Sequence, residues 1–136
     1  MANENPKLTI TLTGRRPVTV AKDVWPILAE AKELEHDNQY EFQANRKTSA
    51  RLAIRQHADG RTIVYGVFQH TTQFQGESDI DVRGGEMISA EDDAIAAVNR
   101  VADDLDQRIT HTGLLDPQPF SRVAHKCIAD LPAEEL

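Results

Sequence analysis

The feature that most constrains the fold is an alternating pattern on both sides of the dipeptide Asp59-Gly60. Apolar and polar residues alternate before and after this dipeptide, as is typical of half-buried strands joined by a tight turn. With Asp59-Gly60 as a two-residue type I′ turn, Leu52 lies opposite Val67 and one face of the hairpin is apolar. The sequence therefore predicts an antiparallel hairpin with a positive φ at Gly60.

Shorter alternating stretches predict further strands at 8–12, 18–20, 40–44 and 80–82. The first two stretches are expected to pair as an N-terminal hairpin, with Leu12 opposite Val18 and the intervening Pro17 at a strand end. This pairing keeps the apolar side chains of both stretches on one face.

Apolar residues at helical spacing predict helices at 23–36, 90–109 and about 120–130. Asp23 is a suitable N-cap for the first helix, and Ser89 with Asp92 forms a variant of the capping box before the second. The expected fold is a single α+β domain over residues 1–136. Its antiparallel sheet has about five strands (an N-terminal hairpin, a helix, then three further strands), and two or three helices cover one face.

Composition limits the class of protein. The chain has 136 residues and a single cysteine, Cys127, which excludes an internal disulfide and fits a reducing cytoplasm. It has no apolar run long enough to span a membrane. We therefore expect a cytoplasmic protein, with no membrane association, that is stabilised by packing alone.

The usual sequence signatures of chemistry are missing. The five histidines form no HxH or HExxH pattern, and there is no nucleophile elbow, P-loop or GxGxxG motif. The sequence therefore predicts no catalytic residue, no metal ligand and no cofactor, and favours a binding protein over an enzyme. An enzyme of unrecognised type remains as an alternative.

The net charge is concentrated in the C-terminal part of the chain. Residues 1–83 hold eleven basic and eleven acidic side chains, whereas residues 84–136 hold four and eleven, and 4 − 11 gives the −7 of the whole protein. Such asymmetry bears on partners and solubility. The acidic side chains expected to face water and to contact a basic protein partner are Asp92, Asp93, Asp103, Asp104 and Asp106. The alternative is an ordinary solvated helix face.

A second candidate surface is basic. The segment 42–75 carries a local charge of +4, from five basic residues against Asp59. The candidate residues for binding nucleic acid, or for another contact with the sheet face, are Arg46, Lys47, Arg51, Arg55, Arg61 and Phe68. Cations beside an aromatic ring suit phosphate contact and base stacking. The alternative is a solvated strand face whose arginines cover apolar neighbours.

Four stretches carry a resemblance: KLTITLTGRRPVTV, NQYEFQANR, RQHADGRTIVYGVFQHTTQFQGE and CIADLPAEEL. The chain resembles small uncharacterised accessory proteins encoded on integrative and conjugative elements and genomic islands of Pseudomonas and related proteobacteria. The resemblance implies a role as a mobile-element accessory protein and assigns no activity and no functional residues.

The leading hypothesis is a non-enzymatic binding protein that contacts a protein partner through an acidic or mixed surface, with interference in host defence as one such role. The alternative is an accessory protein that binds nucleic acid through the basic hairpin face. A homodimer formed through the sheet face or a free strand edge is also expected.

Overall fold

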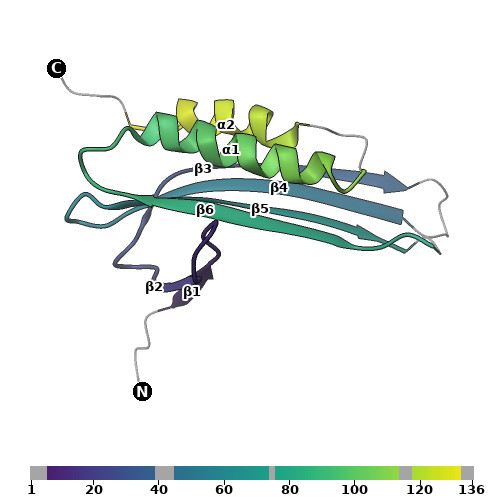
Figure 1. The fold of residues 1–136 in the computed structure, drawn as a ribbon, viewed down its shortest axis with the longest axis horizontal. Coiled ribbons are helices and arrows are strands. Elements are labelled where there is room, and N and C mark those ends of the chain that lie inside the picture. Colours follow the sequence, from purple (N-terminus) through teal and green to yellow (C-terminus); the bar gives the residue numbers. More distant parts are fainter. Residues whose placement is uncertain (1–5, 39–44, 74–75, 114–117, 133–136) are drawn as a thin grey trace.

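The computed structural model describes residues 6–38, 45–73, 76–113 and 118–132. They form an α+β structure (Figure 1). In chain order the elements are β1 (Lys7–Ile10), β2 (Val18–Ala21), β3 (Ile27–Asn38), β4 (Asn45–Gln56), β5 (Thr62–Thr72), β6 (Ile80–Ile88), α1 (Ala94–Thr110) and α2 (Pro119–Ala129). No helix among the described residues is long and apolar enough to cross a membrane.

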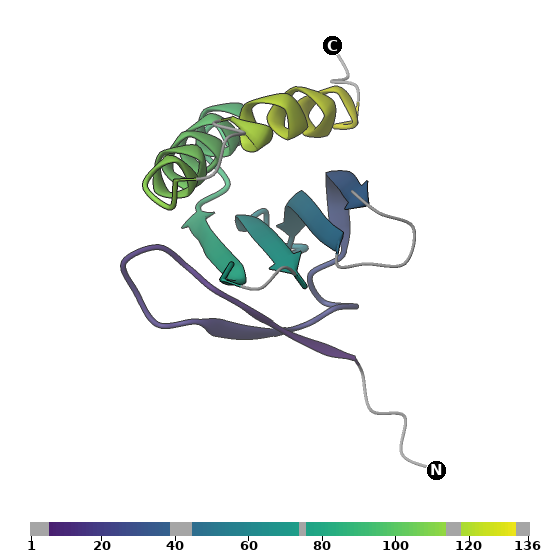
Figure 2. The same ribbon diagram turned by 90° about the vertical axis from the view of Figure 1, so that its right-hand side faces the viewer.

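The elements are arranged in three layers. Strands β3, β4, β5 and β6 form an antiparallel sheet in that order, and β1 pairs with β2 in a separate two-stranded sheet. Helices α1 and α2 lie on one face of the four-stranded sheet, with α1 over β5 and β6 and α2 over β3 and β4. The β1–β2 hairpin lies under the opposite face (Figures 1 and 2).

Each face of the sheet has its own apolar core. Beneath the helices, Leu52 and Phe68 of the sheet pack in one cluster with Leu105 of α1 and Phe120 of α2. On the other face, the hairpin and the segment after it pack against residues of β4 and β5. The fully or nearly buried members of this second core are Ile10, Leu12, Val20, Trp25, Ala53, Ile63 and Tyr65.

The predicted helix over 23–36 is wrong, because these residues include most of strand β3. The segment Ile27–Asn38 pairs with β4 along its length, apart from a shift in register near Ile27. Small and charged residues in this segment also fit a period of two: Ala29 lies in the core beneath the helices, while Lys32 is exposed. A long ladder of backbone hydrogen bonds here overrides the helix propensity of Ala, Glu, Lys and Leu.

The predicted register of the β4–β5 hairpin is wrong by one residue. Leu52 lies opposite Gly66 rather than Val67. Gly60 does have a positive φ of 95°, as predicted, but Asp59 does not have a positive φ, so Asp59-Gly60 is not a type I′ turn. Instead His57 donates its backbone N–H to the carbonyl of Arg61, which gives a longer loop.

The one-residue difference reverses the faces of β5, because side chains alternate along a strand. Val64 and Phe68 enter the core beneath the helices, whereas Tyr65 belongs to the core beneath the hairpin. In the N-terminal hairpin, Ile10 rather than Leu12 lies opposite Val18. The register of this hairpin is therefore shifted by two residues. Because side chains alternate along a strand, the predicted apolar side chains still share one face.

The remaining predicted elements differ mainly in extent. The strand expected at 80–82 continues to Ile88, and the helix expected at 90–109 begins at Ala94 and ends at Thr110. The third expected helix corresponds to α2. The strand expected at 40–44 lies outside the described residues.

We predict that Gly66→Val destabilises the fold. A Cβ atom at Gly66 would lie 2.5 Å from Cδ1 of Leu105 and 2.8 Å from Cε1 of Phe120, where both helices meet the sheet. Overpacking of this kind costs about 1–3 kcal/mol of unfolding free energy. Val67→Thr, on the half-exposed opposite face, serves as the control and should change stability by less than about 0.5 kcal/mol. Denaturant unfolding that gives the same midpoint for both variants would contradict this packing.

Candidate functional site

The hairpin covers only part of the second face of the sheet, and a cleft opens beside it. The cleft has a volume of about 390 Å³ and is bounded by residues 8–11 of the hairpin and by all four strands of the larger sheet. This volume lies in the range typical of ligand pockets, roughly 300–1,000 Å³. We call it the basic cleft, because its charged lining residues are Lys32, Lys47, Arg51 and Arg83.

Two of these cations are neutralised by neighbouring carboxylates. The guanidinium of Arg51 forms an ion pair with Glu30 on the adjacent strand. Nε of Arg83 lies 2.7 Å from a carboxylate oxygen of Asp81. The hydrogen bond from Arg83 lowers the pKa of Asp81, so this carboxyl stays ionised. Arg51 and Arg83 are therefore held in place but contribute little net charge.

The two lysines are different. Lys32 and Lys47 are exposed, and within the described part of the chain neither forms an ion pair. Lys32 also lies directly opposite Arg51 across the β3–β4 pair. Because Glu30 already pairs with Arg51, the uncompensated positive charge at this position is that of Lys32. The basic cleft thus presents positive charge that its described surroundings leave uncompensated.

The cleft is also partly apolar. Leu34 of β3 is 47% exposed, and Val67 of β5, which is half-buried, also lines the cleft. Leu8 and Ile10 extend this aliphatic surface along the hairpin. The result is a mixed surface on which aliphatic groups lie among cations.

The basic residues predicted from the sequence do not form one surface. Lys47 and Arg51 line the cleft. Arg55 is buried, and it donates to the hydroxyl of Tyr65 at 3.0 Å and to the carbonyl of Trp25 at 2.9 Å. Arg55 therefore anchors the segment before β3 to the sheet and is not available to a ligand.

The other residues of the predicted basic face lie outside the cleft. Arg46 pairs with Glu77 near the end of the sheet, at 2.7 Å, and this pairing lowers the pKa of Glu77 to about 2. Arg61 pairs with Asp59 in the hairpin loop. Phe68 is 1% exposed on the opposite face, beneath the helices, so its predicted role in a basic face is wrong.

Sequence reasoning missed Lys32 and Arg83. Lys32 was assigned to the solvent face of a helix, and Arg83 to the end of a short strand. The alternation of β3 and the full length of β6 would have placed both residues on the face of Lys47. Tyr65 is the aromatic residue in the described lining, and it is only 6% exposed, so it offers no open ring for base stacking.

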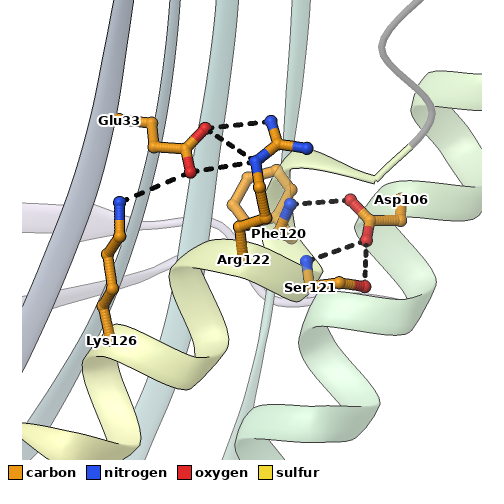
Figure 3. A network of polar contacts seen from close by, with 6 residues as sticks. All are labelled: Glu33, Asp106, Phe120, Ser121, Arg122 and Lys126. Carbon is orange, nitrogen blue, oxygen red and sulfur yellow. Dashed lines mark hydrogen bonds and ion pairs between the residues drawn. The ribbon is translucent and has the colours of Figure 1, made fainter.

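Two of the predicted acidic contact residues, Asp93 and Asp106, cap helices. A carboxylate oxygen of Asp92 accepts from the backbone N–H of Ser89 at 2.9 Å, and Asp93 is the N-cap of α1. Asp106 is 5% exposed and not directed to water, which corrects the prediction. It accepts hydrogen bonds from Phe120 and Ser121, so one helix caps the first turn of the other (Figure 3).

The bonds to Asp106 hold the first turn of α2 against α1. Its oxygens lie 2.8 Å from the backbone nitrogen of Phe120, and 3.0 and 2.8 Å from the backbone nitrogen and Oγ of Ser121. Burial raises the pKa of Asp106, while these hydrogen bonds act in the opposite direction. Asp103 and Asp104 remain at the surface, with Asp104 3.1 Å from Arg108. Asp92 and Asp93 are exposed as well, so Asp106 is the one buried residue among the five predicted acidic residues.

A second polar contact attaches α2 to the sheet. Glu33 of β3 accepts from Arg122 at 2.9 Å and lies 3.5 Å from Nζ of Lys126 (Figure 3). The hydrogen bond from Arg122 lowers the pKa of Glu33. Glu33, which faces the helices, is therefore paired, whereas Lys32 on the other face of the same strand forms no ion pair with a described residue.

The single cysteine lies in the core. The thiol of Cys127 is buried and lies 3.8 Å from the carbonyl oxygen of Leu52. Burial raises its pKa to about 11, so the thiol is protonated at neutral pH. Cys127 thus acts as a small apolar side chain.

We predict that Asp106→Ala lowers the free energy of unfolding by about 1–3 kcal/mol, because it leaves the buried N–H of Phe120 and the part-buried donors of Ser121 without their acceptor. The matched control is Asp103→Ala, three residues earlier on the same helix, where the carboxylate is exposed and bonded only to Gln107 among the described residues. That change should stay within about 0.5 kcal/mol. Equal thermal midpoints for the two variants would contradict the capping role.

Comparison with protein-family models, with curated proteins and with solved structures found no match to this chain. The geometry of the basic cleft therefore carries the functional inference.

Proposed function

We propose that this chain is a non-enzymatic binding protein that binds an acidic segment of a partner protein in the basic cleft. The observation that carries the proposal is that Lys32 and Lys47, beside the exposed side chain of Leu34, form no ion pair with any residue that the structure describes. A polypeptide with both carboxylates and aliphatic side chains matches such a surface. The leading sequence hypothesis named an acidic or mixed surface with acidic contact residues, and the present proposal uses the lysines of the basic cleft instead.

A protein partner fits this surface better than nucleic acid does. Single-stranded nucleic acid gains much of its affinity from stacking on exposed aromatic rings, and Tyr65 is buried with its hydroxyl bonded to Arg55. The formal charge of −7 also opposes the approach of a long polyanion, whereas a short acidic segment meets mainly the local field of the cleft. Nucleic-acid binding is the competing outcome of the test below.

The polar groups at the cleft support binding rather than proton transfer. Glu30 and Asp81 each pair with an arginine, and the pairing holds the pKa of Asp81 below its usual value. A general acid or base needs a pKa near neutrality, and the hydrogen bond from Arg83 moves the pKa of Asp81 further below it. A binding role also suits an accessory protein of a mobile element, as the sequence resemblance implies.

The proposal predicts selective binding of an acidic peptide. The probe is a fluorescein-labelled nonapeptide, ETVTETVTE with blocked ends, in which Glu and Val side chains share one face when the chain is extended. Fluorescence anisotropy should show saturable binding that weakens as salt rises. The peptide QTVTQTVTQ should bind at least about tenfold more weakly, because it carries no carboxylates to pair with the lysines.

Substitution of the lysines tests the site. The double variant Lys32→Gln and Lys47→Gln should weaken binding by several-fold to about tenfold, since each exposed ion pair contributes up to roughly 1 kcal/mol. The control is Arg16→Gln with Lys22→Gln, which makes the same charge change at exposed residues outside the cleft. A four-nucleotide oligothymidine of equal charge is tested in parallel. Tighter binding of the oligothymidine, or equal loss in both double variants, would overturn the proposal.

A further inference from the structure

We infer that the acidic segment binds as an added β-strand along the outer edge of β1, within the basic cleft. This inference rests on the proposed function and specifies how the partner is held. In such β-augmentation the backbone of the partner supplies hydrogen bonds to a free strand edge, and its alternate side chains provide specificity.

The register of the hairpin shows which backbone groups of β1 are free. The N–H of Lys22 donates to the carbonyl of Pro6 at 2.9 Å, so these two residues form a hydrogen-bonded antiparallel pair. Such pairs recur at every second residue, which directs the N–H and C=O of Thr9 away from β2. The hydroxyls of Thr9 and Thr19 lie 3.1 Å apart, as expected where the strands approach closely without exchanging backbone bonds.

This free edge faces the cleft. Four consecutive residues, 8–11, line it. A strand that presented only one face would contribute every second residue, so an unbroken run indicates that the edge itself forms the wall. Within the described residues β1 pairs with β2 alone.

The edges of the larger sheet are partly blocked by other groups. On β6, the carbonyl of Arg83 accepts from the side chain of Arg108 at 2.7 Å, and the carbonyl of Gly85 accepts from the N–H of Thr13 at 2.9 Å. On β3, the N–H of Glu30 is directed to the carboxylate of Asp130 at 3.4 Å. Proteins commonly protect strand edges in this way, which makes the open edge of β1 a suitable place for strand addition.

The charges explain why the added strand is acidic. Alternate side chains of a strand placed beside β1 point toward the floor of the cleft, where Lys32, Lys47 and the exposed Leu34 lie. Carboxylates and aliphatic groups on that face are complementary to the floor. The other face of the added strand points to solvent and takes any polar residue.

A pair of proline variants tests the edge directly. Thr9→Pro removes the N–H that faces the cleft, and Thr19→Pro removes the equivalent outward N–H of β2. Both lose the same hydrogen bond between threonine hydroxyls. Strand addition predicts that Thr9→Pro weakens binding of the ETVTETVTE probe at least fivefold, while Thr19→Pro stays within twofold of the unmodified protein. Equal affinities for the two variants would overturn the inference.

N-methylated probes give the same answer without altering the protein, in case a proline disrupts the hairpin. One probe is methylated at the backbone nitrogens of its threonines, the other at those of its glutamates and valines. Because only one edge of an added strand pairs with β1, one probe should lose binding at least tenfold and the other should retain it. Equal effects of the two methylation patterns would overturn strand addition.

The outcomes separate this inference from the proposed function. If the lysine variant loses affinity while both prolines and both methylated probes bind alike, the cleft binds acidic peptides through side chains and strand addition is wrong. If the lysine variant binds the probe as tightly as the unmodified protein, the proposed function itself fails.

Discussion

A small hairpin that crosses beneath a sheet of long strands determines the architecture (Figures 1 and 2). Strands β3 and β4 each have twelve residues, whereas β1 and β2 each have four. Because the hairpin crosses the longer strands rather than running along them, it covers only part of their length. Residues beneath the hairpin, such as Ala53 and Ile63, are fully buried, while farther along the same face Lys47 is exposed. The boundary between these two regions is the basic cleft.

The opposite face shows how acidic residues serve the fold. Asp106 caps α2, and Glu33 pairs with Arg122 of the same helix, so both helices are bound to each other and to the sheet by carboxylates. Part of the negative charge of the C-terminal region, at Asp106, therefore forms hydrogen bonds within the protein. The positive charge of the cleft is therefore a distinctive property of the surface, although the net charge of the whole chain is −7.

Local signals in the sequence predicted much of the fold. The positive φ of Gly60, the apolar face of the N-terminal hairpin and the apolar stripe that ends near Ile109 are confirmed. The helix expected at 23–36 failed because pairing with β4 is a long-range interaction that no local pattern reports. The β4–β5 register failed because the loop, closed by a bond from His57 to Arg61, is longer than the dipeptide that marks it. Both errors concern strands that line the cleft. The first placed Lys32 on a helix, and the second placed Phe68 on the wrong face of the sheet.

The central claim is that ligands contact the sheet face beside the hairpin rather than the helices. Backbone amide chemical shifts, followed by NMR during titration with the acidic nonapeptide, test it most directly. The account predicts the largest shifts at residues 8–11 and at Lys32, Lys47 and Arg51, with little change along α1 and α2. Shifts centred on the exposed face of α1, around Asp103, with the cleft residues unmoved, would contradict it.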